Sequence, residues 1–267
     1  MQVPVSGPLS TIESITRQLN ALDEIRGTTI LLHSSLSSLG WVCGGAEAVV
    51  LAILSAIGPD GTLVVPTHTG DNSDPAEWQC PPVPREWHAI IRAASPPYNP
   101  PTSRTRGMGV IAETIRTWPG AVRSAHPQTS FAAVGPLAEW LMKGHEVDCR
   151  LGESSPLAKL EKVDAKVLLL GVGFDVCTAF HLAEYRVANN AEEHMKNNSF
   201  AIATEEGRQW ITVTDIRISS DPFGDLGGDF QKAGLVIEGR VGNALVKLFK
   251  ISEAVRYAEG WLQMQRK

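Results

Sequence analysis

Two patterns of apolar and polar positions alternate through the first two-thirds of the chain. Short apolar runs, rich in leucine and β-branched residues, predict buried strands at residues 28–33, 62–66, 129–135 and 166–172. Longer segments with apolar residues at helical spacing predict helices at residues 44–57, 85–94, 107–118, 136–142 and 155–163. Because predicted strands alternate with predicted helices, the order favours parallel crossovers within an α/β sheet.

The two ends of the chain add further elements. Near the N-terminus, Ser10 and Glu13 have the spacing of a capping box, which predicts a helix that begins at Ser10. Toward the C-terminus, the pattern predicts a β-hairpin, a strand and a closing amphipathic helix, at residues 199–204 with 208–216, 242–252 and 253–265.

A proline-rich stretch at residues 67–105 interrupts the alternation. A long ordered loop inside an α/β domain is more often a binding loop than a linker, so we expect it to contact a ligand. Its acidic residues Asp71, Asp74 and Glu77 would form a negative rim for a polyamine or an amino-sugar. The alternative is a solvated acidic loop without a ligand.

Bulk composition narrows the class of protein. The 267 residues carry a net charge of −5, which argues against nonspecific nucleic-acid binding. We expect neither a membrane helix nor a signal peptide, because no segment has the required apolar run. Four cysteines are widely spaced without a C-x-x-C pair, which argues against a structural metal site and favours reduced thiols in a cytoplasmic protein; they are Cys43, Cys80, Cys149 and Cys177.

The first candidate site is the Ser/Gly-rich loop within "LLHSSLSSLGWVCGG" (residues 31–45). It follows a predicted strand that ends at His33 and precedes a helix that begins at Gly44. Ligands of open α/β sheets bind beyond the carboxyl ends of strands, where backbone N–H groups and helix N-termini favour anions. The loop has no P-loop lysine and no G-x-G-x-x-G motif. It therefore predicts an anion site, with a plain turn and capping serines as the alternative.

The second candidate is "RTRGMG" (residues 104–109). Arg104 and Arg106 precede two glycines at the start of a predicted helix, so side-chain and backbone donors could converge on a pyrophosphate. The string also fits the R-x-x-G-x-G/A pattern with which GNAT acetyltransferases bind coenzyme A. Only three positions carry that match, and a glycine-rich start of a helix is the alternative.

The third candidate is "GVGFDVCTAFHLAEYR" (residues 171–186). His181 and Glu184 are three residues apart and share a helical face, while Asp175 lies before the helix. A neutral imidazole can accept a proton near neutral pH, and a carboxylate partner fixes its tautomer. The alternatives are a core histidine bonded to a carboxylate, and a nucleophile–base pair of Cys177 and His181.

Seven blocks of the sequence together resemble one family. They are "HSSLSSLGWVCGGAEAV", "GPDGTLVVPT", "TRGMG", "RSAHPQTSFAAVG", "GESSPLAKL", "LLLGVGFDVCTAFHLAEYR" and "RVGNALVKLF". Their order is that of the aminoglycoside 3-N-acetyltransferases, and the resemblance extends from about residue 10 to the C-terminus. It is closest to the Bacillus-type members, which share the "GWV-x-GG" and "DP-x-EW" stretches.

The resemblance implies transfer of an acetyl group from acetyl-CoA to the 3-amino group of a 2-deoxystreptamine antibiotic, which confers resistance. It also implies a single α/β domain over residues 1–267, with a central mixed sheet flanked by helices, unlike the GNAT fold. No metal cofactor is expected, and both a monomer and a homodimer are compatible with the resemblance. The alternative activity is acetylation of another amine or amino-sugar metabolite without a resistance role, and a non-catalytic binder is a second alternative.

The resemblance also implies roles for individual residues. The family's H-x-A-E element and its preceding Asp correspond to His181, Glu184 and Asp175, the implied catalytic residues. The implied coenzyme-binding residues are His33, Ser34, Ser35, Leu36, Ser37, Arg106, Met108 and Thr178. The implied substrate-binding residues are Asp71, Asp74, Glu77, His126 and Glu184.

Two departures limit this transfer of roles. Some members have Asn where this chain has His126, and the acidic loop is variable, so the accepted antibiotics do not follow from the resemblance.

His68 and His126 each lie next to a predicted strand and compete with His181 for the cleft. We expect direct transfer with His181 as the general base, and a ping-pong reaction through Cys177 is the rival mechanism.

Overall fold

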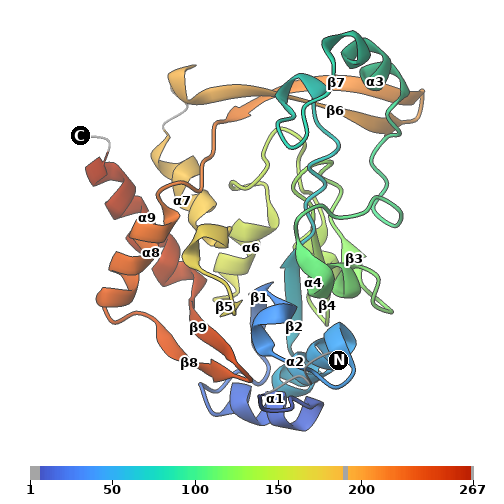
Figure 1. Cartoon of the computed structure of the whole chain (residues 1–267). Helices are drawn as coiled ribbons and strands as arrows, with labels where there is room; N and C mark the ends of the chain where they lie inside the picture. The colour runs from blue at the N-terminus through green and yellow to red at the C-terminus, as the bar shows by residue number, and fades with distance from the viewer. Residues whose placement is uncertain (1–6, 189–191, 266–267) are drawn as a thin grey trace, which may run out of the picture.

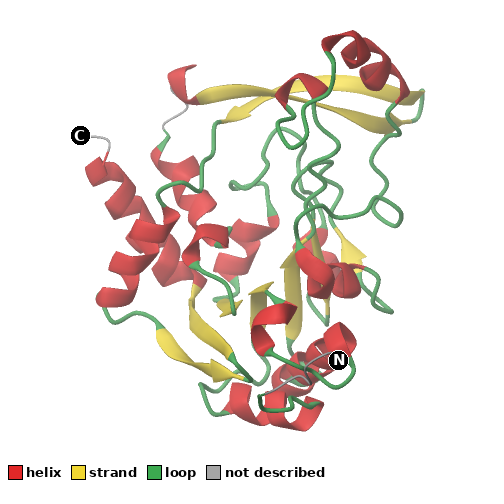
Figure 2. Ribbon diagram, viewed as in Figure 1, coloured by secondary structure: helices red, strands yellow, loops and turns green. Residues whose placement is uncertain are grey.

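The computed structural model describes residues 7–188 and 192–265 and centres on a seven-stranded mixed sheet (Figures 1 and 2). The strand order is β3-β4-β2-β1-β5-β9-β8. Its strands are β1 (Thr29–Ser34), β2 (Thr62–Pro66), β3 (Val122–Arg123), β4 (Phe131–Val134), β5 (Lys166–Leu170), β8 (Ile237–Val241) and β9 (Ala244–Lys250). β1 pairs in parallel with β2 and β5, and the remaining neighbours pair antiparallel. A separate antiparallel hairpin consists of β6 (Met195–Thr204) and β7 (Gly207–Ile216).

Helices cover both faces of this sheet, as Figure 2 shows. The α-helices of the described residues are α1 (Ile12–Asn20), α2 (Gly45–Ile57), α3 (His88–Ala94), α4 (Gly109–Arg116), α5 (Ala138–Met142), α6 (Pro156–Lys162), α7 (Ala179–Val187), α8 (Phe223–Lys232) and α9 (Ile251–Gln265). The 3-10 helices are η1 (Leu36–Leu39), η2 (Pro75–Glu77), η3 (Arg85–Trp87), η4 (Phe174–Val176) and η5 (Glu192–His194). The prediction of a single α/β domain with a mixed sheet flanked by helices is confirmed; its ends, residues 1–6 and 266–267, lie outside the described residues.

Two apolar cores hold the helical layers on the sheet. Side chains alternate across a strand, so Ile30 and Leu32 of β1 face α1, α2 and α4, while Leu31 faces the layer formed by α5 to α9. Each of these three side chains is at most 1% exposed. A strand buried on both faces reads as a continuous apolar run, which is why the apolar run at residues 28–33 identified β1.

The predicted capping box at the first helix is wrong by one residue. The N-cap is Thr11, whose hydroxyl accepts from the Ser14 amide at 3.2 Å, while the Thr11 amide donates to the Ser14 hydroxyl at 2.8 Å. Ser10 instead pairs its backbone with Trp41 and Cys43. This tertiary pairing keeps Ser10 outside the helix, and the hydroxyl of Ser14 serves where Glu13 was expected.

Three elements were absent from the sequence prediction, namely β3, β8 and α8. β3 has two residues, and α8 contains three glycines, which lower its helix propensity. β8 is half-exposed at the edge of the sheet and lacks a continuous apolar run. β3 and β8 complete the sheet, and α8 helps to cover one face of it. These tertiary contacts stabilise the three elements, and the local sequence does not show them.

The proline-rich loop and the hairpin support each other at the top of the molecule in Figure 1. The Asn72 side chain exchanges two hydrogen bonds with the backbone of Ala201 on β6, each 3.0 Å long. The Tyr98 amide also donates to the Ala201 carbonyl, and Arg208 of β7 donates to the carbonyl of Ser95 at 2.6 Å. The loop is therefore an anchored structure rather than a linker.

No helix in residues 7–188 and 192–265 is long and apolar enough to cross a lipid bilayer.

Candidate active site

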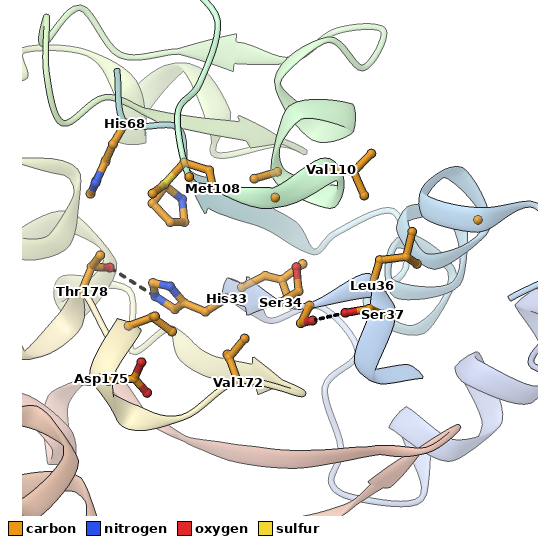
Figure 3. Close-up of a pocket in the computed structure, with 18 of the residues that line it drawn as sticks. His33, Ser34, Leu36, Ser37, His68, Met108, Val110, Val172, Asp175 and Thr178 are labelled. Carbon is orange, nitrogen blue, oxygen red and sulfur yellow. Dashed lines mark hydrogen bonds between the residues drawn. The ribbon is translucent and has the colours of Figure 1, made fainter. Parts of the chain in front are cut away.

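A cavity of about 880 Å³ opens at the carboxyl ends of β1, β2 and β5. Its walls come from these strand ends, from η1, from the first residues of α4 and from the η4–α7 segment. Figure 3 shows Met108 and His68 on one wall and Val172 and Asp175 on the other, with His33 between them. The volume is within the usual range for small-molecule sites, and its position follows the general rule for α/β sheets.

Most of the residues expected to bind coenzyme A meet in this cavity. Its lining includes His33, Ser34, Ser35, Leu36, Ser37, Met108 and Thr178. Arg106 is the exception, because its guanidinium turns away to Asp71 at 2.5 Å and to the Cys80 carbonyl at 2.9 Å. Arg106 therefore does not line the cavity, and its predicted contact with the coenzyme stays a prediction.

The backbone at the start of α4 forms part of one wall of the cavity. Gly109, the first residue of α4, has φ +81°, a conformation that favours glycine. The start of α4 has no side-chain cap, so its first amides can donate to a ligand. Opposite these amides, the hydroxyls of Ser35 and Ser37 lie 3.1 Å apart.

Loop closure at the end of β5 also depends on a glycine. Gly171 has φ +71°, and a Cβ there would collide with the side chain of Ser38. The Ser38 hydroxyl donates to the Gly171 carbonyl at 2.8 Å, which fastens η1 to the segment before η4. This contact connects the two chain segments that line opposite sides of the cavity.

His33 lies at the bottom of the cavity, at the end of β1. Its Nε2 is 3.2 Å from the hydroxyl of Thr178, the residue that precedes α7. Burial, with a smaller contribution from the neighbouring His181, lowers the pKa of His33 to about 3. The ring is therefore neutral at physiological pH and acts as a hydrogen-bonding group rather than as a charge.

His181 and Glu184 form a close pair on α7. Nδ1 of His181 is 2.5 Å from Oε2 of Glu184, and Oε1 of Glu184 accepts from the Ser219 amide at 3.1 Å. The Phe223 ring packs against the imidazole with 4.8 Å between ring centroids. A carboxylate at Nδ1 favours the tautomer in which Nε2 carries the free lone pair. His181 and Asp175 line the cavity, whereas Glu184 supports His181 from behind.

Cys177, unlike His181, does not line the cavity. Its side chain is fully buried in the apolar core beneath α7, and burial raises the pKa of the thiol to about 12. A thiol that is neither exposed nor ionised is a poor nucleophile. The i, i+4 spacing to His181 therefore has a packing explanation.

The family model of the aminoglycoside 3-N-acetyltransferases matches residues 31–263 of this chain. The chain belongs to the aminoglycoside 3-N-acetyltransferase family. It is 43% identical over 252 residues to the SPbeta prophage-derived aminoglycoside N(3')-acetyltransferase-like protein YokD of Bacillus subtilis (strain 168), covering 94% of this chain and 92% of the relative. The crystal structure of YokD has a TM-score of 0.93 at 41% identity and covers 97% of this chain and 94% of that chain.

Two further relatives bear on the reaction. Aminoglycoside N(3)-acetyltransferase VIII of Streptomyces fradiae is 35% identical over 274 residues, covering 96% of this chain and 93% of the relative. A binary complex of AAC-IIIb with CoASH has a TM-score of 0.84 at 30% identity and covers 97% of this chain and 98% of that chain. The predictions of this family, of an acyltransferase and of acetyl-CoA as cosubstrate are confirmed.

The acidic residues of the family's variable loop are each paired with a basic side chain here. Asp71 contacts Arg106, Asp74 contacts Arg92, and Glu77 contacts Lys196, with N–O distances of 2.5, 2.7 and 2.7 Å. None of the three carboxylates lines the cavity. The structure thus does not bring them to the reacting groups, and their role in binding the acceptor stays a prediction.

His126 is also set apart from the cavity. It is fully buried beside His145 and Phe200, and its Nδ1 accepts from the amides of Gln128 and Thr129 at 3.1 Å each. Burial lowers its pKa well below the ordinary value for histidine. These contacts stabilise the turn before β4, and a substrate contact by His126 stays a prediction.

Sequence reasoning undervalued His68, which lines the cavity beyond the end of β2. The sequence feature that could have identified it is its position just after a buried strand, β2, which pairs with β1.

No group of three or more His, Cys, Asp or Glu residues in the described part of the chain is arranged to hold a metal ion.

The buried histidines make stability depend on pH. Burial lowers the pKa of His33 and His68 to about 3 and that of His145 to about 4, whereas an unfolded histidine titrates at 6.5. Below about pH 6.5 the unfolded chain therefore binds more protons than the native chain, and stability falls as pH falls. We expect urea unfolding to give a lower free energy at about pH 5 than at about pH 7. Equal free energies of unfolding at the two pH values would contradict this expectation.

Proposed function

We propose that the chain acetylates the 3-amino group of 2-deoxystreptamine aminoglycosides with acetyl-CoA and thereby confers resistance to these antibiotics. The observation that carries this proposal is the His181–Glu184 pair, whose Nδ1–Oε2 distance is 2.5 Å, at the wall of a cavity that also has an anion-binding side. A basic imidazole next to a site for a phosphate-bearing cosubstrate suits transfer to an amine.

The residues that would hold acetyl-CoA fit its chemistry. The amides at the start of α4, from Gly109 onward, and the hydroxyls of Ser35 and Ser37 supply donors for phosphate oxygens. Apolar side chains at the rim, with Trp41 52% exposed and Val110 52% exposed, would cover the pantetheine arm. The thioester would then extend toward His33 and Thr178 at the bottom of the cavity.

His181 supplies the base in this mechanism. Most amines of an aminoglycoside are protonated at neutral pH, so the 3-amino group must lose a proton before it can attack the thioester carbonyl carbon. Nε2 of His181 takes a proton from the nitrogen, while Glu184 at Nδ1 stabilises the imidazolium. The C–N bond forms and the C–S bond breaks. The His181 imidazolium then gives its proton to the leaving thiolate to form free coenzyme A, and the other proton of the former ammonium group is released to solvent.

The acceptor would approach from the side of the proline-rich loop. Asp175 is a carboxylate in the cavity wall and would attract the cationic antibiotic to the reacting centre. Asp71, Asp74 and Glu77 are proposed to act farther out, where the antibiotic's remaining sugar rings extend. Their existing ion pairs would then have to be exchanged for contacts with substrate amines.

Release of coenzyme A in the presence of different acceptors tests this function. We expect gentamicin-, kanamycin- or neomycin-type antibiotics to support turnover, and NMR of the product to place the acetyl group on the 3-amino nitrogen. Turnover only with a simple amino-sugar would support the alternative activity. Release without any amine would instead identify a thioester hydrolase.

The rival mechanism through Cys177 makes an opposite prediction. We expect Cys177→Ala to keep wild-type turnover within about threefold, because the thiol is buried, protonated and does not line the cavity. Radiolabelled acetyl-CoA without acceptor should leave no acetyl group on the protein. An inactive alanine variant that still folds, together with label on Cys177, would establish the ping-pong rival.

A further inference from the structure

The side chain of His68 lines the reaction cavity and is not used by the mechanism described so far. It follows β2, and Figure 3 shows its ring extending from one wall toward Thr178 on the other side. Its Nε2 is buried and has no hydrogen-bond partner in the described part of the chain. We propose that His68 donates a hydrogen bond to the acyl carbonyl oxygen of the thioester and stabilises the negative charge that develops there.

The protonation state of His68 suits a donor that does not give up its proton. Burial, with smaller contributions from nearby His181 and His33, lowers the pKa of His68 to about 3, so the ring is neutral during turnover. A neutral imidazole has one N–H. A buried N–H without a partner is rarer than a buried acceptor without one, which favours the proton on Nδ1. Nδ1 then carries the N–H, and it is the group that we propose as the donor to the thioester oxygen.

The backbone around His68 is held on both sides. The Thr67 amide donates to the Ser130 carbonyl at 2.8 Å, and the Thr69 amide donates to the Gln128 carbonyl at 2.8 Å. The Arg106 amide donates to the His68 carbonyl at 2.9 Å, and the Phe131 ring meets the imidazole edge-on at 5.7 Å between centroids. A donor fixed in this way stabilises a developing charge without reorganisation.

The position of His68 complements that of His181. The amine gives its proton to His181 and attacks the carbonyl carbon, and the electron pair of the C=O bond moves onto oxygen. His68 donates a hydrogen bond to that oxygen and keeps its proton. When the C–S bond breaks, the electron pair returns to the carbonyl. This inference rests on the proposed acyl transfer, but it requires only that a CoA thioester occupies the cavity.

Two variants of nearly equal shape test this role. His68→Leu removes the donor, whereas His68→Asn has an amide nitrogen at the position of Nδ1. We expect the leucine variant to lose about 10²–10³-fold in kcat with little change in KM for either substrate, and the asparagine variant to recover at least about tenfold of this loss. Equal kcat values for the folded leucine variant and the wild-type enzyme would overturn the inference.

Carbonyl-labelled [13C]acetyl-CoA provides a readout that needs no acceptor. A hydrogen bond to the carbonyl oxygen moves the carbonyl 13C resonance downfield. We expect the resonance of the bound thioester to move in the wild-type protein and in His68→Asn, and to return toward the free position in His68→Leu. A bound wild-type resonance at the free position would overturn the inference, even if the leucine variant did not fold.

Coenzyme A release and the carbonyl resonance distinguish a failure of the proposed function from a failure of the inference about His68. If no aminoglycoside releases coenzyme A, the proposed function fails, and the labelled thioester still decides the role of His68. If aminoglycosides are acetylated but neither kcat nor the carbonyl resonance depends on His68, only the inference about His68 fails.

Discussion

Replacing His181 by alanine is expected to lower kcat for aminoglycoside acetylation by about 10²–10⁴-fold. The imidazole is 13% exposed in the cavity wall, and its Nδ1 is committed to Glu184, so Nε2 is the nitrogen available to the amine. The affinity for coenzyme A should change little, because the groups proposed to bind its phosphates lie around η1 and at the start of α4. Steady-state kinetics with both substrates and calorimetry with free coenzyme A measure the two quantities.

Glu184→Gln is the companion variant for this prediction. It keeps the shape of the side chain but removes the carboxylate charge that stabilises the protonated imidazole, so we expect a smaller loss of kcat than for His181→Ala. Near-normal turnover of His181→Ala would remove His181 from the role of base. A loss of coenzyme A affinity as large as the loss of kcat would point to a collapsed cavity instead.

Replacing Asp215 by alanine is expected to lower the free energy of unfolding by about 3–5 kcal/mol. Asp215 is 2% exposed, and its Oδ2 accepts from the Arg150 amide, from Nε of Arg150 at 3.1 Å and from the Tyr185 hydroxyl at 2.6 Å. Without the carboxylate, the guanidinium of Arg150 would be left as a buried charge without its ion partner. Tyr185 belongs to α7 and follows Glu184, so the same network supports the helix that carries His181 and Glu184.

Asp71→Ala is the matched control for this stability prediction. Asp71 also contacts an arginine, but its side chain is 67% exposed and that of Arg106 is 54% exposed. Such a surface pair contributes at most about 1 kcal/mol. Urea unfolding followed by tryptophan fluorescence compares the two variants. Similar losses for Asp71→Ala and Asp215→Ala would mean that burial does not determine the strength of these pairs.

The sequence predicted the central strands and the shared helical face of His181 and Glu184 for a physical reason. β1, β2 and β5 are buried on both faces, and a strand of this kind is apolar at most of its positions. His181 and Glu184 were predicted to share a helical face because helix geometry places residues i and i+3 side by side. The capping box failed because Ser10 is held by a backbone partner about thirty residues away, at Trp41 and Cys43.

The sequence by itself determined the α/β class, the family and the pair of residues proposed to remove the proton, because each depends on local periodicity or on ordered motifs. Only the tertiary structure decided which charged and reactive groups face the cavity. It turned Arg106 toward Asp71, buried Cys177 and His126, and brought His68 into the cavity wall. The direction and burial of a side chain depend on contacts between segments far apart in the chain, and no local pattern records those contacts.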